Sequence, residues 1–293
     1  MNVFLTGATG FIGSGVLSAL VAAGHSVTAL VRDGDRAAAV RRDAVTPFVG
    51  DLRDGEAVRR LAAEADAVIT TASPGDATSA AVESAFADAV LAGLRPGATF
   101  VRTGGVWVHG SGADLTEDSP VVAPGLVAWR EALDTRVLNA SGIRSLLVEP
   151  GVVYGHGKGL PGVVMSARTA GEPAALVLLG SGAQHWTTIH VDDLAELYVA
   201  VLEHGRPGAR YLGVSGQNPT IREIGEAAAL RRGLDGRVTP EDASDTLARL
   251  GAFGEALLLD QQATGERART ELPWKPTRPS LLDVIAAGAY DPS

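Results

Sequence analysis

The sequence contains no cysteine, and aromatic residues make up only 5% of its 293 residues. Without cysteine the chain has no disulfide, thiolate nucleophile, iron–sulfur cluster or cysteine-ligated zinc. No apolar run reaches the ~20 residues that span a bilayer. The N-terminal residues also lack the basic region of a signal peptide. We therefore expect a cytoplasmic protein that does not enter a membrane.

Basic residues are few as well. The 25 Lys and Arg residues stand against 34 Asp and Glu residues, which gives a net charge of −9. A protein that binds nucleic acid through phosphate contacts has the opposite charge. We therefore expect a small-molecule ligand and no nucleic acid. The 46% of apolar residues is typical of a folded globular protein.

Short apolar runs alternate with helical patterns in the first half of the chain. This alternation predicts an α/β fold with helices on both faces of a doubly wound parallel sheet, the Rossmann arrangement. Beyond Tyr154 the elements become shorter. We expect a dinucleotide-binding domain at 1–154, joined again by part of 183–205, and a smaller C-terminal substrate lobe in 155–293. The predicted strands are 3–5, 27–31, 45–49, 67–70, 99–103 and 144–149, and the predicted helices are 11–23, 54–64, 77–94 and 126–140.

A glycine-rich turn lies between the first predicted strand and the first predicted helix. Gly7 allows a tight turn, Gly10 allows a pyrophosphate to approach the backbone, and Gly13 allows the helix to pack on the strand. The free amides at the helix N-terminus then attract the anion. The alternative is a βα turn without a ligand. The predicted phosphate-binding residues are Gly7, Thr9, Gly10, Phe11, Ile12 and Gly13.

The end of the second predicted strand indicates which dinucleotide is bound. A carboxylate there binds the ribose 2′-hydroxyl of NAD, whereas an arginine receives the 2′-phosphate of NADP. The expected acid position is Val31, and Arg32 follows it, with Arg36 nearby. We therefore predict NADP as the cofactor. Asp33 leaves NAD as the alternative.

Several motifs follow one another along the chain: Thr6–Gly13, Gly50-Asp51-Leu52, Val152-Val153-Tyr154-Gly155, His190-Val191-Asp192-Asp193-Leu194-Ala195 and Leu272-Pro273-Trp274-Lys275-Pro276. This ordered set resembles the extended short-chain dehydrogenase/reductase superfamily, also called the NAD-dependent epimerase/dehydratase family, over residues 1–288. The resemblance implies that Asp51 and Leu52 lie beside the adenine, that Ala72 and Ser73 line the cofactor cleft, and that Pro150 and Val153 pass near the nicotinamide.

The catalytic pattern of this superfamily is missing. Its members use a Ser or Thr after the fifth strand and a Tyr-x-x-x-Lys pair on the next helix. Here the hydroxyl position falls on Gly105, and the pair falls on Leu126 and Arg130, or on Trp129 and Leu133 in a shifted register. The sequence is therefore similar to an atypical member, in which proton transfer through that tyrosine is excluded.

Other residues are candidates for the missing chemistry. Tyr154 follows the sixth predicted strand and is the candidate acid, although a tyrosine in this motif is often structural. Thr103 lies on the same strand face as Gly105, and Arg130 could hold a ribose or phosphate as a fixed cation. The predicted substrate wall is aromatic and mostly uncharged, and it consists of Trp107, His109, Trp129, His156 and Trp186.

The remaining polar motifs favour structural roles. The histidine spacings and the carboxylates complete no metal triad, so we predict no metal site. Asp192 or Asp193 is predicted to cap the helix that follows. The sequence thus favours an NADP(H)-dependent oxidoreductase of a small, weakly charged carbonyl or hydroxyl compound. The alternatives are a redox-neutral epimerase, isomerase or lyase, and a non-catalytic NAD(P) sensor. We expect a monomer or a homodimer.

Overall fold

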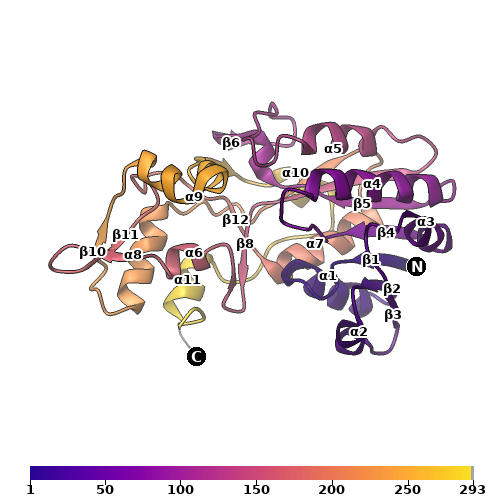
Figure 1. Cartoon of the computed structure of the whole chain (residues 1–293), viewed down its shortest axis with the longest axis horizontal. Coiled ribbons are helices and arrows are strands. Elements are labelled where there is room, and N and C mark those ends of the chain that lie inside the picture. The colour runs from indigo at the N-terminus through magenta and orange to yellow at the C-terminus, as the bar shows by residue number, and fades with distance from the viewer. Residues whose placement is uncertain (292–293) are drawn as a thin grey trace.

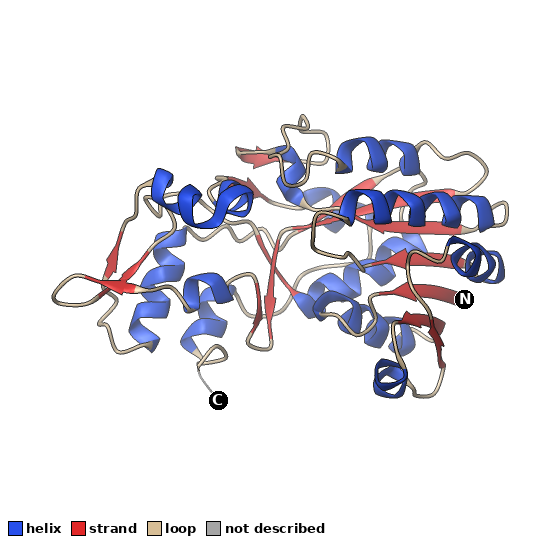
Figure 2. Cartoon of the chain, viewed as in Figure 1, coloured by secondary structure: helices blue, strands red, loops and turns tan. Residues whose placement is uncertain are grey.

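The computed structural model describes residues 1–291, and its centre is a seven-stranded parallel sheet (Figures 1 and 2). The strand order is β13-β7-β5-β4-β1-β2-β3. This is the doubly wound Rossmann arrangement that the alternating pattern predicts. The bounds are β1 Asn2–Thr6, β2 Ser26–Val31, β3 Val45–Val49, β4 Ala67–Thr70, β5 Thr99–Thr103, β7 Arg144–Pro150 and β13 Arg210–Gly213.

Helices cover both faces of this sheet (Figure 2). Val3 and Leu5 face one apolar core, built with α1, α2 and α7, whereas Phe4 faces a second core, built with α3, α4 and α5. Successive side chains of a strand point to opposite faces, so an uninterrupted apolar strand serves both cores. The bounds are α1 Phe11–Ala22, α2 Gly34–Val40, α3 Gly55–Glu64, α4 Ser79–Gly93, α5 Arg130–Leu138 and α7 Val191–His204.

A smaller lobe lies beside the sheet domain, on the left of Figure 1. Its core contains Tyr154, Trp186 and Leu257. The chain returns from this lobe to the large sheet through α7, which packs on α1, and through β13. The lobe and its connections comprise η1 Val106–His109, β6 Gly112–Leu115, β8 Val152–Gly155, β9 Lys158–Gly159, α6 Gly162–Met165, β10 Thr169–Ala170, β11 Ala175–Val177, β12 Thr188–His190, α8 Ile221–Arg231, β14 Val238–Thr239, α9 Ala243–Leu257, β15 Gln261–Ala263, α10 Glu266–Glu271 and α11 Leu281–Ala286.

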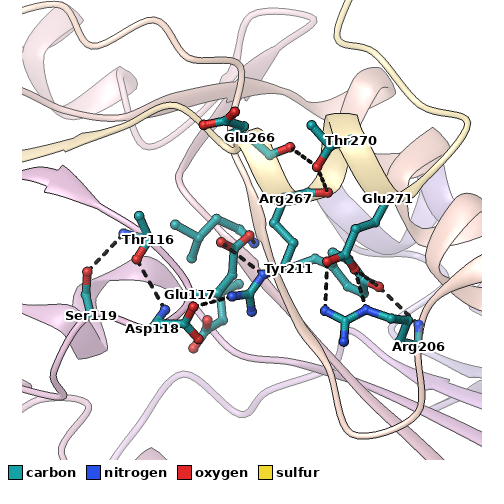
Figure 3. Close-up of polar contacts among 12 residues, drawn as sticks. Thr116, Glu117, Asp118, Ser119, Arg206, Tyr211, Glu266, Arg267, Thr270 and Glu271 are labelled. Carbon is teal, nitrogen blue, oxygen red and sulfur yellow. Dashed lines mark hydrogen bonds and ion pairs between the residues drawn. The ribbon is translucent and has the colours of Figure 1, made fainter.

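Ion pairs attach α10 to the edge strand β13 (Figure 3). Arg206 donates two hydrogen bonds of 2.7 Å to Glu271, which also accepts one of 3.1 Å from the Tyr211 hydroxyl. Buried Glu117 accepts from the backbone amide of Leu212 at 3.0 Å. These contacts satisfy polar groups at the open edge of the sheet. Among residues 1–291, no helix combines the length and apolar character needed to cross a bilayer.

For α5 and α7 the start differs from the prediction, and α2 is not predicted at all. The fifth helix begins at Arg130 and not at 126, because turns occupy the residues after Pro124. The helix expected to follow an Asp192 or Asp193 cap already begins at Val191. His190 is its N-cap, and its Nδ1 accepts from the Asp192 amide at 3.2 Å. The sequence pattern also fails to predict α2, whose N-cap is Asp33.

Candidate functional site

The glycine-rich turn between β1 and α1 is closely packed. Gly7 has a φ of +79°, and the Gly10 amide donates to the Gly7 carbonyl at 2.8 Å. A methyl group on Gly13 would overlap the Gly7 carbonyl and lie 2.6 Å from the Thr71 hydroxyl. The N-cap Gly10 offers no side-chain acceptor to the first amides of α1. These amides are therefore available to an anionic ligand.

A cavity of about 470 Å³, here called the glycine-turn cavity, opens beside this turn. Gly7, Thr9 and Gly10 form one wall. Several other residues that the sequence predicts to bind the cofactor also line it, namely Arg32, Asp51, Leu52, Ala72 and Ser73, together with Arg36. The cavity therefore combines the glycine-rich turn with two cations from the β2–α2 region.

Asp33 is engaged elsewhere. Its carboxylate caps α2 by accepting from the Arg36 amide at 2.8 Å, and it also pairs with the Arg36 guanidinium. The hydrogen bond from the Arg36 amide is the main cause of a lowered Asp33 pKa. Asp33 is absent from the lining of the glycine-turn cavity, whereas Arg32 and Arg36 belong to it. The Asp33 carboxylate, which could have bound a ribose hydroxyl, thus caps α2 instead.

A second cavity of about 340 Å³, here called the strand-end cavity, lies at the carboxyl ends of β4, β5 and β7. It shares Thr71, Ala72 and Ser73 with the glycine-turn cavity, so the two adjoin. An elongated ligand could lie in both. Among the predicted site residues, the strand-end cavity is lined by Phe11, Ile12, Ala72, Ser73, Thr103, Trp107, Arg130, Pro150 and Val153.

Arg130 places a fixed cation in the strand-end cavity. Its Nη1 donates to the Gly104 carbonyl at 2.6 Å, and a methyl group on Gly105 would lie 3.3 Å from the same nitrogen. The guanidinium therefore occupies space beside the position where the superfamily has a hydroxyl. Trp129 supports it, with the guanidinium carbon 5.2 Å from the ring centroid. Burial lowers the pKa of Arg130, but a guanidinium remains charged near neutral pH.

Thr103 lines the same cavity, but its proton is committed. Its hydroxyl donates to the Thr70 carbonyl at 2.5 Å and lies 2.5 Å from the Tyr198 hydroxyl, which must then be the donor. Tyr198 is fully buried on α7, and burial raises its pKa. Thr103 is thus available to a ligand mainly as an acceptor. The sequence pattern gives no sign of Tyr198, because it lies 95 residues away along the chain.

The structure does not bring Tyr154 to the strand-end cavity. The side chain is 1% exposed within the core of the smaller lobe, and its hydroxyl donates to the Pro279 carbonyl at 2.8 Å. Burial raises the Tyr154 pKa further above its ordinary value. This placement argues against Tyr154 as the replacement acid. The reason is that β8 pairs with β12 in a separate small sheet and turns the ring inward.

Four of the five predicted substrate-wall residues also lie outside this cavity. Trp186 is buried in the smaller lobe and donates to the Leu257 carbonyl at 3.1 Å. His109 is buried between Ser119 and Glu149. Burial alone would lower its pKa, but the hydrogen bond and charge of Glu149 raise it. Trp129 lies behind Arg130. Only Trp107 lines the cavity as predicted.

His156 belongs to a different surface. Its side chain is 62% exposed, and its Nε2 lies 3.0 Å from Asp192 Oδ1, in a groove between α1 and α7. One ligand-type atom each of His156, His190 and Asp192 lies within 4.8 Å of the others. The absence of a metal site therefore stays a prediction. His156 does not reach the strand-end cavity, so the substrate contact predicted for it is not supported.

Glu83 is a site residue that the sequence analysis did not predict. It projects from α4 into the lining of the strand-end cavity, and its Oε2 accepts from Arg102 Nη2 at 3.1 Å. The only hint in the sequence is an acid within an alanine-rich helix. Among the cavity-lining residues, Glu83 and Arg130 are the ones with ionisable acid or base groups.

The comparisons with known proteins agree with this arrangement. A family model described as NAD(P)H-binding matches residues 7–205. The chain is 30% identical to an uncharacterized protein of Schizosaccharomyces pombe, covering 99% of this chain and 100% of that protein. It is 31% identical to a 3-diazoavenalumate denitrifying reductase of a Streptomyces species, covering 97% and 99%.

Solved structures confirm the fold. A dTDP-glucose 4,6-dehydratase from Streptomyces venezuelae with NAD bound matches with a TM-score of 0.77 at 22% identity, covering 99% of this chain and 96% of that one. This match shows the Rossmann arrangement that the alternating pattern predicts. The residues matched by the family model, 7–205, contain the glycine-rich turn and the wall that the two cavities share. Because of this match, the chain belongs to the NAD(P)H-binding family.

Proposed function

We propose that this protein is an NADP(H)-dependent oxidoreductase that reduces a small, weakly charged carbonyl compound. The observation that supports it best is the pair of adjoining cavities. One holds the glycine-rich turn, and the other holds the half-buried guanidinium of Arg130 at the carboxyl ends of the strands. A dinucleotide bound across both would place its phosphates at the α1 amides and its reactive ring near Arg130.

Two cations support NADP over NAD. Arg32 and Arg36 both line the glycine-turn cavity, and a guanidinium binds a phosphate through charge-assisted hydrogen bonds. The nearby carboxylate of Asp33 is held by the amide and guanidinium of Arg36. A 2′-phosphate in this cavity would meet the guanidinium groups of Arg32 and Arg36, while the carboxylates of Asp51 and Asp76 line it as well.

We expect the double substitution of Arg32 and Arg36 by serine to weaken binding of 2′,5′-ADP about 10- to 100-fold, because charge-assisted hydrogen bonds to the phosphate are lost. Calorimetric titration would measure this, with Arg41→Ser as the control, since Arg41 is exposed at the end of α2 and does not line the cavity. Equal affinity of the double variant and the wild type would contradict the choice of NADP.

The chain's own residues would assist reduction in a simple way. Bound NADPH supplies the hydride. The Arg130 guanidinium donates hydrogen bonds to the substrate oxygen and stabilises the negative charge that develops there. Arg130 does not give up a proton, and Thr103 donates its proton to Thr70. We therefore propose that the proton comes from water and not from Arg130 or Thr103.

The lining also bears on the substrate. Trp107, Val127 and Leu160 make part of the wall apolar, which favours a small carbonyl compound over a carbohydrate. The Streptomyces relative named as a denitrifying reductase supports reduction as the reaction. The dehydratase among the structural neighbours keeps a redox-neutral reaction as the second candidate.

A substrate panel would test the reaction class. Aldehydes, ketones, quinones and an aryl diazonium salt would each be mixed with protein and NADPH, and loss of NADPH absorbance would be compared with a protein-free control. We expect protein-dependent NADPH consumption with at least one compound, matched by an equal amount of reduced product. Conversion without net NADPH consumption would favour a redox-neutral enzyme. Binding of NADPH without any conversion would favour a sensor.

A further inference from the structure

One wall of the strand-end cavity is a short segment after β5, residues 105–110, which contains η1. Val106 and Trp107 of this segment line the cavity, and Pro150 at the end of β7 lines it as well. Buried Gln261 donates from Nε2 to two carbonyls of the segment, at 2.8 and 2.7 Å. Side chains from other elements therefore help to hold this wall in place.

His109 belongs to the same segment and is fully buried, as is Glu149 near the end of β7. Its Nδ1 lies 3.2 Å from the carbonyl oxygen of Ser119, and its Nε2 lies 3.3 Å from Glu149 Oε2. A carbonyl oxygen accepts hydrogen bonds and donates none, and the same is true of an ionised carboxylate. A neutral imidazole has a single N–H and would leave a bare nitrogen against one of these oxygens. An imidazolium donates from both nitrogens and satisfies both contacts.

The charged groups around this contact come from several elements. Arg210 of β13 has its Nη1 3.4 Å from Glu149 Oε1, which favours the ionised carboxylate. Asp134 of α5 lies within electrostatic range of Glu149 and is itself paired with Arg102. Burial alone would lower the pKa of His109, and the charge of Arg210 lowers it as well, but the hydrogen bond and charge of Glu149 raise it overall. The surroundings therefore favour the protonated ring.

We propose that His109 is a positioning residue, a buried imidazolium that fixes the Trp107 wall of the strand-end cavity to β7. One residue separates Trp107 from His109 in η1, and Pro150 follows Glu149 directly, so the contact joins two walls of one cavity. Where the inference concerns NADPH, it rests on the proposed function, which places the nicotinamide in this cavity.

The sign of the pH dependence follows from the raised pKa of His109. The contact is complete below the ordinary pKa of histidine, ~6.5, and is lost as the pH rises through the higher pKa of the folded protein. A neutral ring would leave one of its two acceptors without a proton. We therefore expect the Trp107 wall to loosen in alkaline solution.

Nuclear magnetic resonance of the histidine ring nitrogens tests the protonation state. At about pH 7.5, where an ordinary histidine is mostly neutral, we expect both ring nitrogens of His109 to carry protons. Glu149→Gln should shift the titration of His109 to lower pH by about one unit or more, because the neighbouring negative charge is lost. The matched control is Glu203→Gln. It removes the carboxylate beside buried His25, and neither residue lines the two cavities, so the His109 titration should stay unchanged.

A second measurement tests whether the imidazolium positions the wall. In protein labelled with 5-fluorotryptophan, we expect the fluorine resonance of Trp107 to shift with rising pH along the titration curve of His109. The resonance of Trp274, which is buried against α7, should not follow that curve. Glu149→Gln should bind NADPH about fivefold more weakly, as when the competent wall is populated about one fifth of the time. It should bind 2′,5′-ADP, which ends before the nicotinamide, as the wild type does.

Several results would overturn the proposal. They are a neutral His109 ring at about pH 7.5, a Trp107 resonance that does not follow the His109 titration, and unchanged NADPH binding by Glu149→Gln. Equal weakening of NADPH and 2′,5′-ADP would show a general effect on the fold and would also count against it. The pH titrations use the wild type and so remain decisive if Glu149→Gln does not fold. Failure of the wild type to bind NADPH or 2′,5′-ADP would instead refute the proposed function, and the two resonance measurements would still test His109.

Discussion

Replacing Asp134 with alanine is expected to lower the free energy of unfolding by about 3–5 kcal/mol, the usual cost of removing one partner of a buried ion pair. Arg102 lies on the inner strand β5 with only 2% of its side chain exposed, and it pairs with Asp134 from α5 and with Glu83 from α4. The substitution leaves the guanidinium with Glu83 as its remaining carboxylate partner. Burial raises the pKa of Asp134 to about 6, so we would measure urea unfolding at about pH 8, where the carboxylate is ionised.

The exposed pair Asp88–Arg136 provides the control for this experiment. The side chains are 58% and 43% exposed, with 3.3 Å between Arg136 Nη2 and Asp88 Oδ1. Asp88→Ala should cost less than about 1 kcal/mol, because water screens an exposed ion pair. Equal losses of unfolding free energy in the two variants would mean that the buried Arg102–Asp134 pair contributes no more to stability than the exposed Arg136–Asp88 pair.

The strands of the sheet domain could be predicted because each is marked by a short apolar run within its own sequence. The predicted ranges 45–49, 67–70 and 99–103 coincide with β3, β4 and β5, since each contains a short apolar run that is followed by a polar residue or glycine. Helix starts were harder, because capping depends on individual side chains. At α7 the cap is His190, while the buried carboxylate of Asp193 accepts from the amides of Thr277 and Arg278, each at 3.0 Å. No local pattern distinguishes these two roles.

In the candidate site, too, local features could be predicted and features that depend on tertiary packing could not. The glycine-rich turn and Arg32 could be predicted, because the turn and the end of β2 are local features. The direction of Tyr154 could not, because it depends on the pairing of β8 with β12, some 36 residues later in register. Glu83 and Arg130 line the same cavity because α4, β5 and α5 pack together. A single sequence contains no pattern that connects them.

Replacing Gly13 with alanine is expected to weaken NADPH binding about 100-fold or more, the effect of losing two hydrogen bonds to a charged group. The added methyl group would overlap the backbone carbonyl of Gly7 and lie 2.6 Å from Thr71 Oγ1. Gly7 holds a φ of +79° and has Thr71 and Ala72 packed against it, so the turn has no room to give way. The helix must move away from the turn, and its first amides then no longer meet the pyrophosphate. Calorimetric titration with NADPH would measure the loss.

Gly15 on the same helix separates this effect from a general effect of alanine in α1. A methyl group there would lie 3.4 Å from the Ala195 side chain, an ordinary contact distance. A helix with alanine at an interior position is more stable than one with glycine there by about 1 kcal/mol. Gly15→Ala should therefore leave the protein as stable as before or more so, and it should keep the affinity for NADPH. If Gly13→Ala bound NADPH as well as Gly15→Ala does, the close contact between α1 and the turn would not be what presents the helix amides to the cofactor. If both variants lost binding equally, the loss would come from the helix as a whole and not from the space beside Gly7.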